Sequence, residues 1–384
     1  MIGLLKKLFQ VKDQNMDYFP KNIPLKSTPY FITDKSIIRQ KLLSINNSFC
    51  QYSLSFNIAF SFKTNYDFAK SDFLHKNKIL AETVSENEFK LALKSGFDSS
   101  NIIINGPNKT NLLSIIKTKS IIHLDNFSEI DKLPSKGITA RIGIRLNFSS
   151  INSRFGFNID NGDALKAINI LKKKNITLDS LHIHLGSDIY EPSIYRQAAI
   201  KTTRFIIDNN LKPKTIDFGG GYPAHGQTPY GRKFTNSLDI SKYIKAIVIP
   251  LKLLPYKTTI IIEPGRYLID DATVFVTKII NKTIKNNTQI ITVDATINML
   301  PSLWYRPPII KFVDHNFHTL KTPKIKTIIY GSSCQEHDIM YQGFNNNVII
   351  GNFVVFYAVG AYNQSMSPDF IFKKPKTIFI KGEN

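Results

Sequence analysis

Six places in the chain put residue types that can do chemistry within, at the end of or just beyond an apolar run. Their residues are Lys63, Glu82, Arg145, His184 with Ser187, Gly219-Gly220-Gly221, and Glu263 with Gly265 and Arg266. A lysine amine can form an imine, a carboxylate can hold a proton, and the bare N–H groups of glycines can bind a phosphate. Taken singly, each place is as well explained by a surface lysine, a core histidine or a tight turn. Taken together, they predict one site.

Lys63 is the candidate for covalent chemistry. It ends the apolar segment Leu54–Lys63, and it lies within Phe60-Ser-Phe-Lys-Thr-Asn65. We expect the loss of water around such a lysine to favour the neutral amine, which is the form that makes an imine.

The elements that must position these residues alternate between apolar runs and amphipathic segments. Helices are predicted over Glu86–Ser95 and Ala164–Lys174, and Gly96 provides a stop after the first. The strand candidates are Leu54–Lys63, Ile79–Ser85, Asn101–Gly106, Ser120–Asp125, Ile138–Asn147, Leu178–Ser187, Lys214–Gly219 and Thr258–Glu263. Eight such units predict an α/β fold with a closed, TIM-like (β/α)8 barrel, whose active-site face is formed by the carboxyl ends of its strands.

A second domain follows, because the sequence changes character after about residue 269. Short runs rich in Val, Ile, Thr and aromatic residues predict a mostly antiparallel sheet. These runs are Thr273–Ile280, Gln289–Val293, Lys326–Ile329 and Phe353–Tyr357. We expect residues 50–268 to form the barrel, and residues 1–49 with 269–384 to form the β-rich domain.

The composition limits the possible functions. The net charge is +21, but lysine spread over every segment carries it, without the aromatic interleaving or zinc-ligand spacing of nucleic-acid binders. Only two cysteines occur, Cys50 and Cys334, so a reducing cytoplasm is expected. Met1–Gln10 is too short and too charged for a signal peptide, and no run is long enough to span a membrane. No metal site and no nucleic-acid partner are predicted.

The motifs resemble, in their order, those of the fold-type III pyridoxal-phosphate decarboxylases, the group of ornithine and diaminopimelate decarboxylases, whose barrel is of the alanine-racemase type. The resemblance runs from about residue 30 to 372. Its motifs are Phe60-Ser-Phe-Lys-Thr-Asn65, Glu82-Thr-Val-Ser-Glu-Asn-Glu88, His182-Ile-His-Leu-Gly-Ser187, Asp217-Phe-Gly-Gly-Gly-Tyr-Pro223, Glu263-Pro-Gly-Arg266, Gly331-Ser-Ser-Cys334 and Gly360-Ala-Tyr-Asn-Gln-Ser-Met-Ser367.

The resemblance implies a role for each residue. Lys63 would carry pyridoxal phosphate as a Schiff base, and His184 would stack on the ring. Glu263 would pair with the pyridine nitrogen and keep it protonated, which makes the ring a stronger electron sink. Cys334 would donate the proton to Cα across the interface of a homodimer with shared sites. The cofactor's phosphate would be held by Ser187, Gly221, the backbone of Gly265 and Arg266, and Tyr362; Glu82, Arg145, Gly219 and Gly220 complete the cofactor set.

Two departures from the family bear on the substrate. The arginine that holds the distal carboxylate of diaminopimelate is missing after Val293-Asp-Ala295, and Arg306 comes too late. The acidic residue that follows the cysteine is replaced by Gln335. Glu336 or Asp338 would supply a carboxylate only in another register. We expect the substrate set to comprise Arg266, Tyr305, Gln335, Glu336 and Tyr362, and the substrate to be an L- or D-amino acid with an amide or carboxylate at its far end, such as a siderophore intermediate.

Three alternatives remain open at this point. The first is diaminopimelate decarboxylation in lysine biosynthesis. The second is a racemase of the same barrel class, which would set an arginine against the pyridine nitrogen and is disfavoured by Glu263 with Cys334. The third is a non-catalytic binding protein, against which the intact Lys63 argues.

Overall fold

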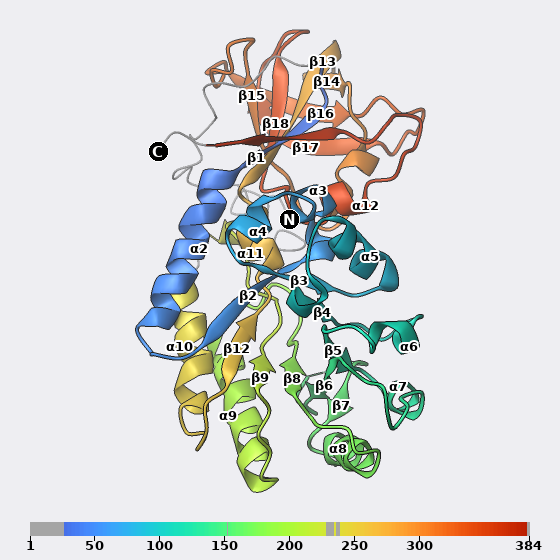
Figure 1. Cartoon of the computed structure of the whole chain (residues 1–384). Helices are drawn as coiled ribbons and strands as arrows, with labels where there is room; N and C mark the ends of the chain where they lie inside the picture. Colours follow the sequence, from blue (N-terminus) through green and yellow to red (C-terminus); the bar gives the residue numbers. More distant parts are fainter. Residues whose placement is uncertain (1–26, 152, 228–233, 236–238, 382–384) are drawn as a thin grey trace. The chain divides into compact units, whose positions relative to one another are not determined.

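The computed structural model describes residues 27–151, 153–227, 234–235 and 239–381, so Met1–Gln10 lies outside the described residues. The contacts divide the chain into two compact units (Figure 1). The barrel unit contains residues 40–223 and 239–268, and the β-rich unit contains residues 1–39, 224–238 and 269–384.

The predicted barrel is confirmed. Eight parallel strands pair in a closed ring in the order β2-β3-β4-β5-β6-β8-β9-β12, and β12 returns to β2. The strands are β2 (Phe56–Ser61), β3 (Leu80–Thr83), β4 (Ile102–Ile104), β5 (Ile121–Leu124), β6 (Arg141–Asn147), β8 (Ser180–Ile183), β9 (Thr215–Asp217) and β12 (Thr259–Ile262), with β7 (Phe157–Asn158) beside β6. They are continuous apolar runs, such as the fully buried Ile102–Ile104, because parallel strands are covered on both faces.

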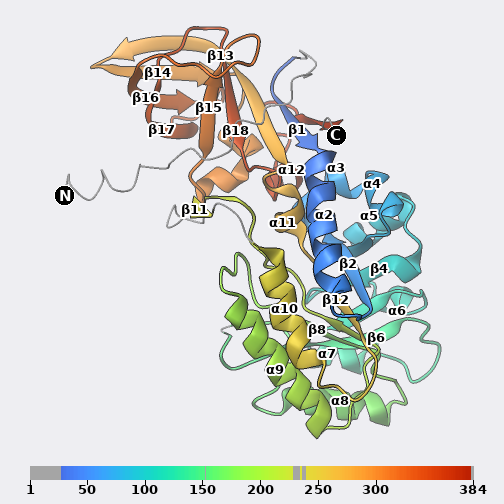
Figure 2. The ribbon, with the colours of Figure 1, turned by 90° about the vertical axis from the view of Figure 1, so that its left-hand side faces the viewer.

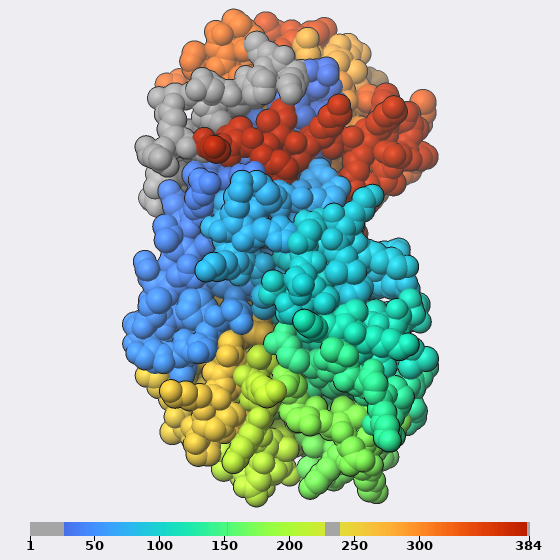
Figure 3. Space-filling model, viewed as in Figure 1, coloured from blue at the N-terminus to red at the C-terminus, as the bar shows by residue number. Residues whose placement is uncertain are grey.

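Helices surround the ring of strands, and α9 lies beside α10 (Figure 1 and Figure 2). The helices are α2 (Lys35–Cys50), η1 (Phe62–Thr64), α3 (Tyr66–Ala69), α4 (Phe73–Lys76), α5 (Glu86–Lys94), η2 (Ser99–Asn101), α6 (Leu112–Ile115), α7 (Phe127–Asp131), α8 (Asp163–Lys173), α9 (Pro192–Asp208), α10 (Ile240–Leu251) and α11 (Gly265–Ile269). The Ser85 hydroxyl caps α5 by accepting the Glu88 N–H. Side chains of α5, α6 and α7 form one surface of this unit in Figure 3.

The β-rich unit has the predicted sheet, which is mostly antiparallel. Its main path runs β15-β18-β13-β14-β16-β17, while β1 pairs with β13 and β19. The strands are β1 (Tyr30–Asp34), β13 (Thr273–Lys285), β14 (Thr288–Val293), β15 (Ile309–Val313), β16 (Lys324–Tyr330), β17 (Ile339–Asn346), β18 (Phe353–Tyr357) and β19 (Lys376–Ile380), with the short pair β10 (Gly226–Gln227) and β11 (Phe234–Thr235). Three short helices, η4 (Ile297–Met299), η5 (Pro301–Trp304) and α12 (Asn363–Met366), lie between strands.

The division of the chain differs from the predicted one at the N-terminal side and at residues 224–238, which group with the β-rich unit. Residues 40–49 belong to helix α2 and group with the barrel, whereas the sequence analysis placed them in the β-rich domain. The apolar side chains Ile38, Leu42, Ile45 and Phe49 are buried, and they recur at the spacing of one helix face. Among the described residues, no helix combines the length and the apolar character needed to cross a bilayer.

Candidate active site

Lys63 faces a carboxylate at the carboxyl end of the barrel strands. It lies in η1, two residues beyond the end of β2, and not within the strand as predicted. Its Nζ donates to Ser61 Oγ at 2.7 Å and to Glu82 Oε2 at 2.8 Å, and the Ser61 hydroxyl also donates to Glu82. The Lys63 side chain is 33% exposed while that of Glu82 is 1% exposed. What distinguishes the Lys63 amine is therefore its ion pair with a buried carboxylate, more than its own burial.

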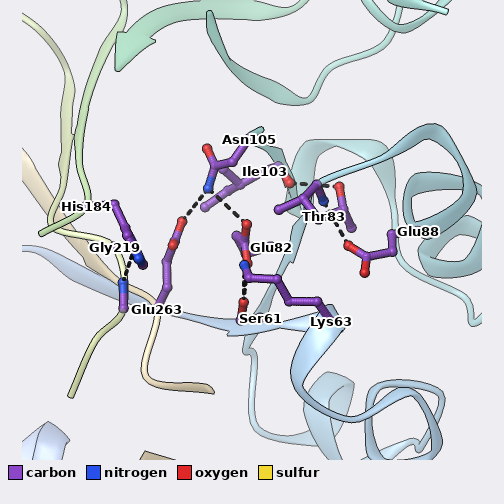
Figure 4. A network of polar contacts seen from close by, with 12 residues as sticks. Ser61, Lys63, Glu82, Thr83, Glu88, Ile103, Asn105, His184, Gly219 and Glu263 are labelled. Carbon is purple, nitrogen blue, oxygen red and sulfur yellow. Dashed lines mark hydrogen bonds and ion pairs between the residues drawn. The ribbon is translucent and has the colours of Figure 1, made fainter. Parts of the chain in front are cut away.

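A second buried carboxylate, Glu263, follows β12, which only β2 separates from the strand of Glu82, and one amide bridges the two carboxylates. Asn105 Nδ2 donates to Glu82 Oε1 at 3.1 Å and to Glu263 Oε1 at 2.7 Å (Figure 4). Burial raises the pKa of the Asp217 carboxyl well above its usual range, and the charge of Glu263 raises it further. This shift favours the protonated form of Asp217.

Two histidines of the predicted motif are neutral. Burial, and then the charge of Arg145, lower the pKa of His184 to about 3. The Gly220 N–H donates to His184 Nδ1 at 3.3 Å, which requires a free lone pair on that nitrogen. Burial also lowers the pKa of His182 well below its usual range, and its Nε2 lies 3.9 Å from Glu263 Oε2. A neutral His184 ring suits stacking against another aromatic ring.

We expect the buried, neutral His182 to make the free energy of unfolding depend on pH. Below about pH 6.5 the unfolded chain binds a proton on this histidine and the folded chain does not, so stability falls as the pH is lowered, by up to about 1.4 kcal/mol per pH unit. Urea denaturation between pH 7.5 and 5 should therefore show a shallower fall for His182→Gln than for the unmodified protein. His315→Gln, at an exposed histidine, is the control; parallel curves for His182→Gln and the unmodified protein would contradict this expectation.

The glycine run after β9 approaches other backbone too closely for any side chain. A Cβ on Gly219 would lie 2.8 Å from Ile183 O, and one on Gly221 would lie 2.5 Å from Gly186 O. The sequence analysis expected the whole run to offer free N–H groups. In the structure, the Gly219 amide donates to Asp217 at 2.8 Å and the Gly220 amide donates to His184. The Gly221 amide has no partner among the described residues, so it is the one available to an anion.

The remaining barrel residues of the predicted set lie around the same end of the strands. Arg145 Nη1 is 3.5 Å from Asp125 Oδ1, and Arg266 Nε is 3.4 Å from Asp188 Oδ1. Ser187 is exposed in the loop after β8. The Gly265 amide already donates to Glu263 O at 2.8 Å, and a Cβ on Gly265 would collide with Thr64 Oγ1.

The other predicted residues belong to the β-rich unit. Cys334 is exposed, which argues against a buried structural cysteine. In the same loop, Gln335 is half-buried and Glu336 is exposed. Tyr305 follows η5, and Tyr362, with a positive φ of 66°, precedes α12; both are half-buried.

Asp338 is excluded as a substitute for the missing acid. It is 0% exposed, and both of its carboxylate oxygens accept hydrogen bonds. Oδ1 accepts the Ile297 N–H at 2.7 Å, while Oδ2 accepts the Ser333 N–H at 3.0 Å and the Ser333 hydroxyl at 2.5 Å. This carboxylate shapes the turn that carries Cys334 and Gln335, and its complete burial leaves neither oxygen accessible to a substrate.

A metal ion is the alternative occupant of the barrel site. His182, His184 and Glu263 bring three ligand atoms within 4.8 Å of one another. However, His184 Nδ1 already accepts the Gly220 N–H, and one oxygen of Glu263 is held by Asn105. A carboxylate, a flat neutral imidazole, a free glycine amide and a paired lysine fit a planar, phosphorylated aldehyde better than a bare ion.

Several residues that shape this site were not predicted from the sequence. Ser61 lies two residues before Lys63, so the strand period of two could have indicated it. Asp217 and His182 were quoted in motifs but not assigned to the site. Asn105 gave no signal beyond its place directly after β4, because its partners come from other strands.

Known proteins resemble the chain over nearly all of its length. A family model described as pyridoxal-dependent decarboxylase, pyridoxal binding domain, matches residues 35–270. The diaminopimelate decarboxylase of Bacillus subtilis (strain 168) is 24% identical over 393 residues, which cover 92% of this chain and 87% of the relative.

Two solved structures have a similar fold. The arginine decarboxylase of Paramecium bursaria Chlorella virus superposes with a TM-score of 0.78 at 19% identity, over 92% of this chain and 96% of that one. The lysine/ornithine decarboxylase of Vibrio vulnificus, complexed with cadaverine, superposes with a TM-score of 0.78 at 20% identity, over 92% of this chain and 94% of that one.

Proposed function

Because the chain belongs to the family of pyridoxal-dependent decarboxylases, we propose that it decarboxylates an amino acid whose distal nitrogen is carried as an amide. The products are the corresponding amine and CO2, and the cofactor is pyridoxal phosphate. A conjugated amino acid of the kind found as a siderophore intermediate has this chemistry.

The barrel residues fit the cofactor in the roles that the family resemblance suggests. Lys63 would attach it, the neutral His184 ring would stack against it, and the Glu263 carboxylate would hold a proton on the ring nitrogen. The Gly221 amide would bind the phosphate, together with Ser187 and the backbone of Arg266. When bound, the cofactor supplies an electron sink for the pair left at Cα. A carboxylate at the ring nitrogen favours this chemistry over racemisation.

The protein's own groups then have two tasks. The bond between Cα and the carboxylate carbon breaks, CO2 leaves, and Cα keeps the electron pair until it receives a proton. The exposed Cys334 carries an S–H group that can deliver this proton. Glu82, which accepts from the Lys63 amine at 2.8 Å, orients that amine for attachment and release.

The substrate proposal rests on the loop after Cys334, which offers a neutral amide and no accessible carboxylate at the position next to the cysteine. By the family resemblance, Gln335, a neutral amide, stands where a residue would contact a distal ammonium. The buried Asp338 already accepts hydrogen bonds from Ile297 and Ser333. An amide side chain can donate to a carbonyl and accept from an N–H, so it matches an acylated nitrogen better than an ammonium.

Diaminopimelate is the second candidate substrate, and the name of the Bacillus subtilis relative favours it. Its distal carboxylate needs a cation, and no arginine follows Val293-Asp-Ala295 until Arg306, which is largely buried. The experiment that separates the candidates is a screen for CO2 release with free amino acids, meso-diaminopimelate and citrate-linked amino acids. CO2 release from none of them would contradict the proposed activity.

We further propose a homodimer in which Cys334 of one subunit serves the Lys63 site of the other. Mixing inactive Lys63→Ala and Cys334→Ala chains should then restore about one quarter of the activity, because half of the dimers are mixed and each has one intact site. Lys63→Ala mixed with the double variant Lys63→Ala/Cys334→Ala is the control and should stay inactive. No recovery, with subunit exchange shown by mass spectrometry, would rule out the shared site.

A further inference from the structure

The Asn105 side chain can adopt only one orientation between Glu82 and Glu263. Its amino group donates to both carboxylates, at 3.1 and 2.7 Å (Figure 4). A flipped amide would turn its Oδ1 toward two carboxylates and leave Asn105 buried without these bonds. The amide is therefore fixed with its nitrogen toward the site and its oxygen toward the barrel interior.

A chain of hydrogen bonds continues from Asn105 into the barrel. His123 Nδ1 lies 2.7 Å from Asn105 Oδ1, and His123 Nε2 lies 2.7 Å from Ser180 Oγ. The Thr215 hydroxyl donates to Ser180 Oγ at 2.7 Å. These residues come from β5, β8 and β9, so three strands converge on one amide of the loop after β4.

Only one arrangement of protons satisfies this chain. Because Asn105 Oδ1 can only accept, His123 must donate from Nδ1. Burial lowers the pKa of His123 well below its usual range, so the ring is neutral and its Nε2 must accept from the Ser180 hydroxyl. Each link therefore donates toward the site, from Thr215 to Ser180, then to His123 and to Asn105.

The bridge matters because two carboxylates that share a buried site cannot both stay ionised without compensation. Glu82 also accepts from Ser61 and Lys63, but Asn105 provides the one donor among the described residues that the two carboxylates share. We propose that Asn105 is a positioning residue that keeps Glu82 and Glu263 ionised and aligned, with its amide oriented by His123, Ser180 and Thr215. This inference rests on the proposed function, in which Glu82 faces the Lys63 amine and Glu263 faces the cofactor's ring nitrogen.

The test uses Asn105→Leu, which keeps the volume and removes the donor. Without cofactor at pH 7, the infrared difference spectrum against the unmodified full chain should gain one band of a protonated carboxylic acid. With cofactor, kcat should fall roughly 10- to 100-fold while KM changes little, as expected when an orienting partner is lost. Asn147→Leu, which removes another buried amide that bonds to Ser153 O at 2.8 Å, is the matched control.

The outcomes separate this inference from the proposed function. A new acid band in a protein that releases no CO2 from any substrate would support the bridge and contradict the enzyme activity. An active Asn105→Leu variant with no new band and the kcat of Asn147→Leu would overturn the positioning role.

A measurement on the unmodified protein covers the case in which Asn105→Leu does not fold. In 15N-histidine spectra, His123, assigned by its loss in His123→Gln, should carry its proton on Nδ1. A proton on Nε2 would overturn the proposal. Ser180→Ala should weaken the preference of the His123 proton for Nδ1. It should also lower kcat, but by less than Asn105→Leu does.

Discussion

Lys63→Ala should abolish covalent attachment of pyridoxal phosphate and lower kcat by roughly 10^4-fold, the scale of losing a residue that forms the covalent bond to the reacting group. The physical reason is that no other described lysine combines this place, at the carboxyl end of β2, with a buried carboxylate partner at 2.8 Å. In the unmodified protein, borohydride reduction and peptide mapping should place the pyridoxyl label on Lys63. The imine absorbance band should be missing in the variant.

Two further variants make this result specific. Lys63→Arg keeps the positive charge beside Glu82, but a guanidinium does not lose its proton and cannot form the bond, so it should be as inactive as alanine. Lys70→Ala removes an exposed lysine seven residues on, whose Nζ lies 3.4 Å from Asp67, and it should bind the cofactor normally. A pyridoxyl label on another lysine, or normal turnover by Lys63→Ala, would refute the assignment.

The barrel was predictable because its signal is local. Each strand is a short apolar run with a glycine or polar residue close after its end, and all eight predicted runs contain a strand, as Ser120–Asp125 contains β5. The predicted ranges are longer than the strands, since the apolar character continues into buried loop residues. Phe62, which is fully buried yet lies in η1, is an example.

Elements that depend on distant partners were not found. Strand β17 (Ile339–Asn346) contains a glycine and three asparagines or glutamines with little strand propensity, and its pairing with β16 makes it a strand. Strand β1 pairs in parallel with β19 from the other end of the chain. The local sequence of β17 or of β1 does not indicate which strand it pairs with.

Within the site, too, residues with a local signal were predicted, and residues whose role depends on distant partners were missed. Lys63, Glu263 and His184 were found because each lies at or just beyond the end of a predicted strand. Asn105 was missed because its role lies in bonds to side chains on three other strands. The fully bonded state of Asp338 could not be inferred either, since its partner Ile297 is remote in sequence.

The largest effect on specificity is expected at the distal end of the substrate. A charged group that is buried without a partner costs about 3 to 5 kcal/mol, and a missing polar partner can change discrimination by roughly 10^4-fold. Ornithine and lysine would bring an ammonium to the neutral Gln335, and meso-diaminopimelate would bring a carboxylate that meets no matched arginine. We expect all three to be poor substrates by kcat/KM, and a derivative with its distal nitrogen acylated to be far better.

Substitutions in the loop after Cys334 can reverse this preference. Gln335→Glu restores the acidic residue and should raise kcat/KM for ornithine or lysine by at least roughly 10-fold while lowering it for the acylated derivative, because a carboxylate pairs with an ammonium and repels a carbonyl oxygen. His337→Gln, at an exposed residue of the same loop, is the control and should change neither value. All measurements need equal cofactor loading, checked by absorbance.

Each contrary result identifies a different group at the distal end. If the unmodified protein turns over ornithine efficiently and Glu336→Gln loses this activity, Glu336 makes the contact to the distal amine. Asp338 is not the alternative, since both of its oxygens already accept hydrogen bonds. Efficient turnover of meso-diaminopimelate would mean that Arg306 or another cation reaches the distal carboxylate, and Arg306→Gln would then reduce it. The proposal that the neutral amide of Gln335 binds the distal group of the substrate agrees with one result only. The unmodified protein must prefer the substrate with an acylated nitrogen, and Gln335→Glu must reverse this preference.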